Sequence, residues 1–360
     1  MKYSTCIGID THAKKNAVCA LDTVTGEVRE ALLCEDPGKL IAWIADQGFA
    51  EPLMCVYETG PTGFGLARAL QAAGIGCIVA ATSKLAYPKD KDKRDDKDAE
   101  WLARQLLAGA VRPVRVPSER EESLCRLSKL RAEAALDLRR AKQRLRSFML
   151  VAGIGYTATK KLWTKRFMSW ARSHECGQPA DTFTFREKHA EVVRLMERLA
   201  RIEAEILRTV ESDPELAAKM SRLLCVHGIG KVTAFSLLCE VYDFSRFRKG
   251  SAFSCWLGLV PSESTTGERR SLGGITKLGN SNLRRLVIEA AGCYSRAAGA
   301  PAPMPPEAPA AVAAKAAKCR DRLFARRRRL RERGLTPNKA KAAIARELAE
   351  WVYYIMVMPA

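Results

Sequence analysis

Four carboxylates in the first hundred residues have the types and spacing of a divalent-metal site. Asp10 and Glu58 each end a short apolar run, whereas Asp95 and Asp98 lie three residues apart and therefore share a face if the segment is helical. Carboxylate oxygens suit Mg²⁺, and two such ions about 3.5–4 Å apart serve phosphoryl transfer. The pattern suits hydroxyl attack on a phosphodiester. The plainer alternatives are that Asp10 opens a turn and that residues 89–98 form a solvated linker.

A second set of reactive groups lies between residues 262 and 285. Ser264, Thr265 and Thr266 directly precede Gly267. A hydroxyl can attack a phosphodiester, and neighbouring cations stabilise the charge that develops on the phosphate. The segment is predicted to bind nucleic acid through Arg269, Arg270, Lys277, Arg284 and Arg285. We predict a hydroxyl-rich loop that is followed by cations and glycine turns. The alternative is a Ser/Thr-rich surface loop that only forms hydrogen bonds to DNA.

A Gly-x-Gly turn between two apolar segments is a further candidate for nucleic-acid binding. Gly228, Gly230 and Lys231 follow His227, and the chain after them has a helical pattern. Glycines let a backbone approach a phosphate closely, and a helix N-terminus offers free N–H groups. We therefore predict a helix-hairpin-helix that binds DNA without sequence preference, with His227 in a structural role.

Composition indicates a polyanionic partner. The chain has 360 residues and a formal net charge of +20, an excess for which nucleic acid is the commonest explanation. An uncharged apolar run of 18 residues is absent, so we expect no membrane partner. The twelve cysteines form no C-x-x-C pair, and no signal peptide precedes the first apolar run, which together favour the reducing cytoplasm.

Residues 1–110 are predicted to form a mixed α/β domain that positions the carboxylates. An apolar hairpin comes first, and a third strand, two helices and two further strands follow it. The later strands are expected at 26–34, 53–58 and 76–80, one helix is expected to start at Asp36-Pro37, and the other is expected at 64–73. In open α/β sheets ligands bind at strand ends, which is where Asp10 and Glu58 lie.

Residues 111–220 are predicted to be helical. After an extended linker at 112–117, helices are expected over 118–151 and 185–211, each with an apolar stripe. The stripes would be buried by an antiparallel pair within the chain or by a coiled coil between chains. The basic stretch 139–146 could follow a phosphate backbone, and residues 152–184 have no readable pattern.

The remaining chain divides into a block at 221–297, which holds the turn and the hydroxyl segment, and a tail at 298–360. The tail is predicted to contain a Pro/Ala-rich linker over 298–311 and a basic helix over 315–333 that lies on nucleic acid. A final helix is expected to run to Tyr354 and to pack on the preceding block.

These motifs together resemble the IS110 family of transposases. Ile7-Gly8-Ile9-Asp10, Tyr57-Glu58-Thr59-Gly60 and Lys93-x-Asp95-x-x-Asp98-Ala99 resemble its DEDD domain, which is similar to the Holliday-junction resolvase RuvC and has a ribonuclease-H-like fold. Gly258-Leu-x-Pro, Gly-x-Ile-x-Lys-x-Gly-Asn and Leu-Arg-Arg resemble its transposase-20 domain. The resemblance covers about residues 4–110 and 221–295.

The resemblance implies an insertion-sequence transposase that binds Mg²⁺ (or Mn²⁺) through Asp10, Glu58, Asp95 and Asp98. It implies DNA as substrate, an element-encoded guide RNA, a homo-oligomer, and a place in the bacterial cytoplasm near the nucleoid. In the family a Ser before the Gly is the nucleophile and forms a phosphoserine link to DNA. Here Thr266 occupies that position. We expect Thr266 to attack, although Ser264 could replace it or strand transfer could be impaired.

Two other functions fit the same residues. A junction-resolving nuclease would use the four carboxylates with water as nucleophile, and would leave free DNA ends. A nucleic-acid-binding protein without catalysis would bind in a salt-sensitive way and would cleave nothing.

Overall fold

The computed structural model describes residues 3–60, 62–81, 95–159, 161–266, 269–295, 304–305 and 307–359, with only the backbone for 95–96, 264–266 and 269–272. Lys93, Gly267 and part of the predicted Pro/Ala-rich linker lie outside the described residues, as does the side chain of Asp95. The chain forms two compact units, residues 1–119 and 120–360. Each is described by itself.

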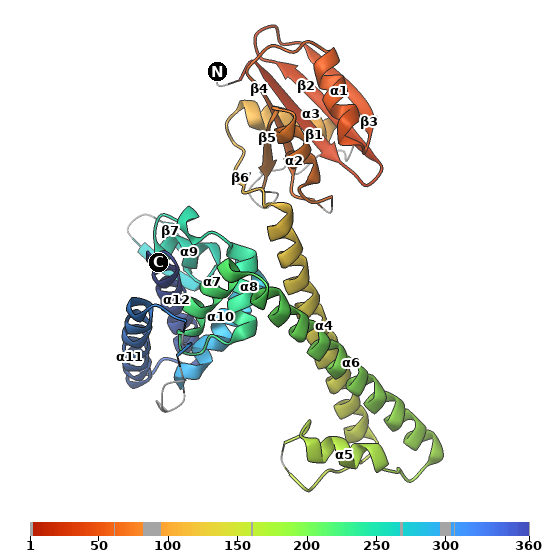
Figure 1. Ribbon diagram of the computed structural model, residues 1–360, viewed down its shortest axis with the longest axis vertical. Helices are drawn as coiled ribbons and strands as arrows, with labels where there is room; N and C mark the ends of the chain where they lie inside the picture. The colour runs from red at the N-terminus through yellow and green to blue at the C-terminus, as the bar shows by residue number, and fades with distance from the viewer. Residues whose placement is uncertain are drawn as a thin grey trace. The chain divides into compact units, whose positions relative to one another are not determined.

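The first unit is built on a six-stranded mixed sheet of order β3-β2-β1-β4-β5-β6 (Figure 1). The strands β1 and β2 are antiparallel, as are β2 and β3, whereas β1, β4 and β5 are parallel and β6 is antiparallel to β5. The strands are β1 (Thr5–Thr11), β2 (Lys15–Asp22), β3 (Val28–Cys34), β4 (Leu53–Glu58), β5 (Gly76–Ala80) and β6 (Pro113–Val114).

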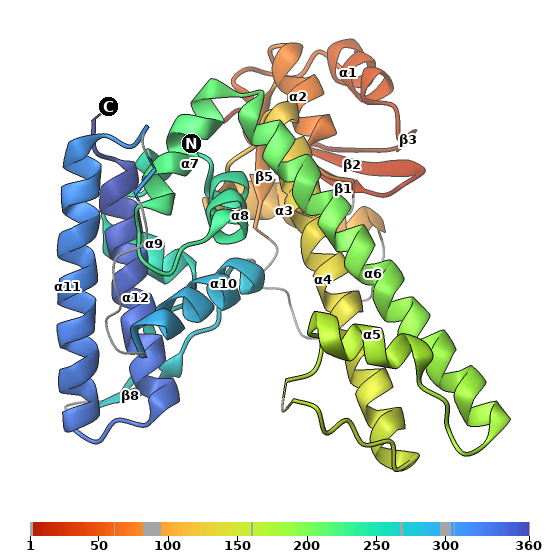
Figure 2. The same cartoon turned by 60° about the horizontal axis from the view of Figure 1, so that its bottom comes forward.

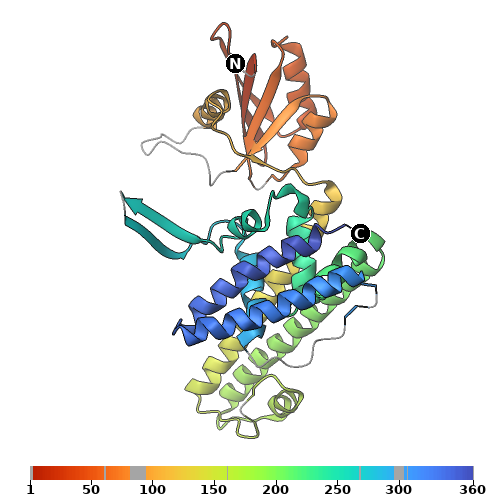
Figure 3. The same ribbon diagram turned by 90° about the vertical axis from the view of Figure 1, so that its left-hand side faces the viewer.

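Three helices cover the two faces of this sheet. The helices α1 (Pro37–Asp46) and α2 (Gly65–Ala72) pack against Ile7 and Ile9 on one face. Helix α3 (Asp95–Leu107) covers the other face, opposite α1 and α2 (Figure 3). Asp36 caps α1 by accepting a 2.8 Å hydrogen bond from the Gly38 N–H.

This mixed sheet with helices on both faces has the ribonuclease-H-like fold that the sequence predicted. One detail differs. The segment 112–117 is not only a linker, because Pro113 and Val114 pair with Ala80 and Val79 and add an edge strand. The two-residue strand is short enough to leave little unpaired edge.

In the second unit the long helices α4 (Glu119–Val151) and α6 (Pro179–Glu211) form an antiparallel pair (Figures 1 and 2). Arg131 Nε donates to Glu203 Oε1 over 2.9 Å, and Arg198 pairs with Asp137 at 3.5 Å. Of the two arrangements that the sequence left open, the antiparallel pair within the chain therefore forms. The short helix α5 (Lys165–Ser173) packs through Phe167 against an apolar cluster that α4 and α6 share.

The rest of the second unit is a helical body around one large apolar core. Its helices are α7 (Pro214–Leu224), α8 (Lys231–Val241), α9 (Gly250–Trp256), α10 (Ser281–Ala291), α11 (Ala310–Glu332) and α12 (Pro337–Met356). Helix α12 buries Ile344, Leu348 and Val352 in this core, so the predicted packing of the final helix is confirmed. Helix α11 begins at Ala310, five residues before its predicted start, because the alanines after the prolines continue the helix.

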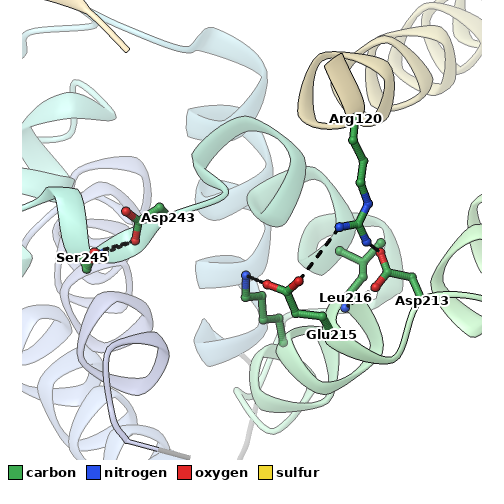
Figure 4. A network of polar contacts seen from close by, with 7 residues as sticks. Arg120, Asp213, Glu215, Leu216, Asp243 and Ser245 are labelled. Atoms are coloured by element: carbon green, nitrogen blue, oxygen red, sulfur yellow. Dashed lines mark hydrogen bonds and ion pairs between the residues drawn. The ribbon is translucent and has the colours of Figure 1, made fainter. Parts of the chain in front are cut away.

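A polar network fastens the first turn of α4 to α7 (Figure 4). Arg120 pairs with Asp213, and its Nη1 lies 3.9 Å from Glu215 Oε2. Asp213 is also the N-cap of α7, where its Oδ1 accepts from the Leu216 N–H over 3.1 Å. In the described part of the chain, no helix is long and apolar enough to cross a membrane.

Candidate active site and nucleic-acid interface

Asp10 and Glu58 lie at the carboxyl ends of neighbouring parallel strands. The register of β1 and β4 pairs Ile9 with Tyr57, so the next residue in each strand is one of the two carboxylates. Because parallel strands end at the same edge of a sheet, Asp10 and Glu58 stand beside each other there.

Both carboxylates belong to the sheet face that α3 covers. Side chains alternate between faces along a strand. Cys6 in β1 and Val56 in β4 cluster with Leu102 of α3, and Asp10 and Glu58 lie an even number of residues after them. The opposite face carries α1 and α2.

Gly8 brings α3 into direct contact with β1. A Cβ at Gly8 would lie 1.9 Å from the Ala99 carbonyl oxygen and 2.6 Å from the Ala103 nitrogen, so only glycine fits this approach. Farther back along β1, Cys6 clusters with Leu102. Residues of β1 that are nearer to Asp10 therefore lie against residues of α3 that are nearer to its first turn. Asp95 and Asp98, which precede Ala99, lie at that end.

The backbone thus directs the acidic end of α3 toward the strand ends, but the side chains do not form a closed metal cage. Asp10 Oδ2 accepts a 3.0 Å hydrogen bond from His12 Nε2, and the Asp10 side chain is 24% exposed. Among the side chains that the structure describes, no group of three or more His, Cys, Asp or Glu is close enough to hold a metal ion. The side chain of Asp95 is not among them.

The hydroxyl segment is a β-hairpin rather than the predicted loop with glycine turns. Strands β7 (Pro261–Thr266) and β8 (Arg269–Ile275) pair in antiparallel fashion, with Thr266 opposite Arg269 beside the turn. The β-branched threonines favour extended backbone. Gly273 belongs to β8 and not to a turn, and a Cβ there would lie 2.4 Å from Ser262 Oγ.

Close backbone contacts hold the base of the hairpin. A Cβ at Gly258 would lie 2.1 Å from the Leu278 carbonyl oxygen. Arg284 Nη1 donates to the carbonyl oxygens of Leu257 and Leu278 over 3.1 and 2.9 Å. Arg284, which the sequence assigns to nucleic acid, thus has a structural role of its own.

Two more of the predicted cations, Lys277 and Arg285, have described side chains, and both are exposed. Lys277 has a positive φ of 57° and is exposed beside the hairpin. Arg285 donates to Glu289 Oε1 over 2.9 Å and to Asn282 Oδ1 over 3.0 Å. An exposed ion pair of this kind contributes about 1 kcal/mol or less, so Arg285 can exchange Glu289 for a phosphate at low cost.

The Gly-x-Gly turn joins α7 to α8, and its two glycines have different roles. Gly228 has a φ of +87°, and a Cβ there would lie 2.5 Å from the Ala290 carbonyl oxygen of α10, so its identity is explained by packing. Gly230 is the exposed N-cap of α8 with open space around it, and Lys231 is exposed directly after it. Gly230 and Lys231 are therefore the open part of the turn.

His227 packs inside this turn and is structural, as predicted. Its ring lies 5.0 Å from the Tyr294 ring and 5.3 Å from the Phe324 ring. Tyr294 Oη donates to the His227 carbonyl oxygen over 3.0 Å. Burial, and after it the charge of Arg320, lower the pKa of His227.

The close packing of α3 on Gly8 was not predicted from the sequence, although Gly8 was part of the motif around Asp10. The signal was present, because a glycine inside an otherwise apolar strand marks a close approach by another backbone.

Comparison with known proteins decides the family. A model described as the transposase IS116/IS110/IS902 family matches residues 220–303, and a second model, described as a transposase and of the IS110 DEDD type, matches residues 7–153. A putative transposase of Sinorhizobium fredii is 33% identical over 364 aligned residues, which cover 97% of this chain and 87% of that protein. The chain belongs to the IS110/IS116 transposase family.

Other relatives carry the same description. The transposase is 28% identical over 301 residues to the transposase for insertion sequence element IS1533 of Leptospira borgpetersenii, across 81% of the chain and 85% of the relative. It is 30% identical over 202 residues to a probable family 20 transposase of Pseudomonas aeruginosa, across 56% and 59%. The transposase is thus an enzyme that acts on DNA, and its DEDD domain indicates dependence on a divalent metal ion.

Proposed function

We propose that this transposase cuts and rejoins DNA by metal-assisted attack of the Thr266 hydroxyl on a phosphodiester. In this proposal Asp10, Glu58, Asp95 and Asp98 hold Mg²⁺ or Mn²⁺. The observation that supports it most is the contact of Gly8 with α3, which directs the acidic end of the helix toward the two strand-end carboxylates.

The donor chemistry fits a hard divalent cation, since all four predicted ligands are carboxylates. A bound ion of this kind supplies Lewis-acid stabilisation of charge on the phosphoryl oxygens. Asp10 must turn from His12 to serve as a ligand, which breaks the hydrogen bond between these two side chains.

Thr266 supplies the nucleophile in this proposal. Its hydroxyl oxygen forms a new bond to phosphorus while the bridging P–O bond to one DNA strand breaks. The hydroxyl proton leaves to solvent, and the departing strand oxygen takes up a proton. One phosphodiester replaces another, so the step needs no external energy source. Arg269 is the register partner of Thr266, and we propose that it stabilises charge on the phosphate.

The nucleic-acid contacts in the proposal come from the second unit. Gly228, Gly230 and Lys231 bind the DNA backbone, and Arg270, Lys277, Arg284 and Arg285 complete the surface around the hairpin. A guide RNA and a homo-oligomer are proposed from the family resemblance. The net charge of +20 supports a nucleic-acid surface larger than one duplex requires. The proposed location is the bacterial cytoplasm.

Because Thr266 stands where the family has serine, hydrolysis is the alternative reaction. The extra methyl group of threonine crowds attack on phosphorus, so water held by the same carboxylates is the alternative nucleophile. That nuclease reaction leaves free DNA ends and no protein–DNA link.

The carboxylate assignment is tested with Asp10→Asn and Glu58→Gln, using Asp46→Asn as the matched control, because Asp46 is an exposed carboxylate of the same unit at the end of α1. Cleavage of labelled donor DNA is measured in Mg²⁺, in Mn²⁺ and without metal. We expect the first two variants to lose about 10³-fold in rate, which corresponds to ~4 kcal/mol of transition-state stabilisation. Wild-type rates in Asp10→Asn would refute the metal-site assignment.

A further inference from the structure

Helix α11 lies against the Gly-x-Gly turn although the two are far apart in the sequence. The ring of Phe324 in α11 is 5.3 Å from the ring of His227 and 5.1 Å from that of Tyr294. Arg320 lies four residues before Phe324, one turn earlier on the same side of α11. Both family models leave residues 304–360 unmatched, so neither accounts for this contact.

The side of α11 that contacts the turn through Phe324 also carries arginines. Arg320, Phe324, Arg327 and Arg331 are spaced i, i+4, i+7 and i+11, which places them on one side of the helix. Arg320 pairs with its neighbour Asp321, at 3.0 Å. Within the described residues, Arg327 and Arg331 form no ion pair, so their charges are not neutralised by the protein.

A different side of α11 fastens the helix to the protein. Arg322 and Arg326 both pair with Glu347 of α12, whose side chain is only 8% exposed. The two helices run side by side (Figures 2 and 3). Helix α11 also buries Val312, Cys319 and Leu323 in the core of the second unit. The stripe with Arg327 and Arg331 is thus held on a rigid, packed helix.

We propose that this arginine stripe and the Gly230–Lys231 turn form one continuous surface for the phosphate backbone of duplex DNA. The inference rests on the proposed contact of the turn with DNA. Eleven residues of helix span about 16 Å. The part beyond Phe324, which contacts the turn, is about 10 Å long and can follow about three base-pair steps at ~3.4 Å each. Duplex DNA is the expected partner because the turn has the helix-hairpin-helix pattern, and RNA is the competing one.

The test measures how binding depends on salt. Each phosphate contact to duplex DNA contributes about 0.9 to the slope of log affinity against log salt. We expect the double variant Arg327→Gln/Arg331→Gln to reduce that slope by about 1.8, and the lysine pair at the same positions to restore it. Arg166→Gln/Arg201→Gln is the charge-matched control, because both residues are exposed and lie on α5 and α6, outside α11 and the Gly-x-Gly turn. An equal loss in the control would overturn the inference, since net charge alone would then explain it.

Two further measurements distinguish failure of the extended surface from failure of the proposed contact between the turn and DNA. Lys231→Gln tests the turn, and a slope lower by about 0.9 is expected. If Lys231→Gln lowers the slope and the Arg327/Arg331 pair does not, the extended surface is refuted and the turn contact stands. If Lys231→Gln leaves the slope unchanged, the turn contact itself fails. The same titrations with an RNA of equal length complete the test, and a loss confined to RNA would overturn the assignment to DNA.

Discussion

Replacing Gly8 with alanine is the smallest change that should separate the two parts of the predicted metal site. The added methyl carbon would lie 1.9 Å from the Ala99 carbonyl oxygen and 2.6 Å from the Ala103 nitrogen. Both are backbone atoms of α3, so no side-chain rotation relieves the contact. Real Cβ atoms essentially never come closer than 3.0 Å, and α3 must therefore move away from β1 by about 1 Å.

The displacement should affect catalysis more than stability. Overpacking of a well-packed core costs about 1–3 kcal/mol, although alanine in place of glycine in a strand with free space would stabilise by ~0.5–1 kcal/mol. A shift of about 1 Å in a group that positions reacting atoms costs on the order of 10²-fold in rate. Because Asp98 directly precedes Ala99, the carboxylate moves together with the helix.

The assay compares donor-DNA cleavage and thermal unfolding of Gly8→Ala with those of Gly65→Ala. Gly65 belongs to the same unit, has ordinary backbone geometry, and has nothing within 4 Å of the position that an added methyl group would take, so it controls for the glycine-to-alanine change itself. We expect Gly8→Ala to cleave about 10²-fold more slowly and to unfold several degrees lower. Wild-type cleavage by Gly8→Ala would refute the argument that close packing of α3 positions the acidic residues.

Two other predictions concern the second unit. Glu347→Gln should lower the free energy of unfolding in urea by about 1–3 kcal/mol, because it removes the charged acceptor of Arg322 and Arg326, and an unchanged unfolding midpoint would contradict this role. Burial, and after it the charge of Arg172, lower the pKa of His189 below its usual 6.5, so the unfolded chain binds more protons there. The free energy of unfolding should therefore fall as the pH drops through 6.5 toward the lowered pKa. The His189→Gln variant should lose less of this free energy than the wild type between about pH 7 and 5. Equal losses in urea titrations of the two proteins would contradict the assignment.

Much of the first unit could be predicted because each local signal agreed with the final fold. The apolar runs before Asp10 and Glu58 became neighbouring strands, and Asp36-Pro37 began a helix as capping predicts. Parallel pairing of β1 and β4 then brought the two carboxylates together without any further information. These features depend on short apolar runs and on a capping residue, both of which are visible in the sequence.

Predictions failed where distant segments determine the structure. The hydroxyl segment was expected to be a loop, but the pairing of β7 with β8 stabilises extended strands that neither half displays alone. The close contacts that Gly228 and Arg284 make with distant backbone were not predicted either. The proximity of Phe324 to His227 has no sequence signal at all, since it depends on how α11 folds back onto the body.

The most direct test of the central claim is to trap and locate a protein–DNA link. Purified transposase is incubated with labelled donor DNA, its flanking noncoding RNA and Mg²⁺, and any covalent adduct is mapped by mass spectrometry. We predict an adduct at Thr266 that Thr266→Ala and Asp10→Asn both abolish and that Thr266→Ser preserves. Cleavage with free ends and no adduct would contradict the account in favour of a water nucleophile, and an adduct that survives Thr266→Ala would contradict the assignment of Thr266.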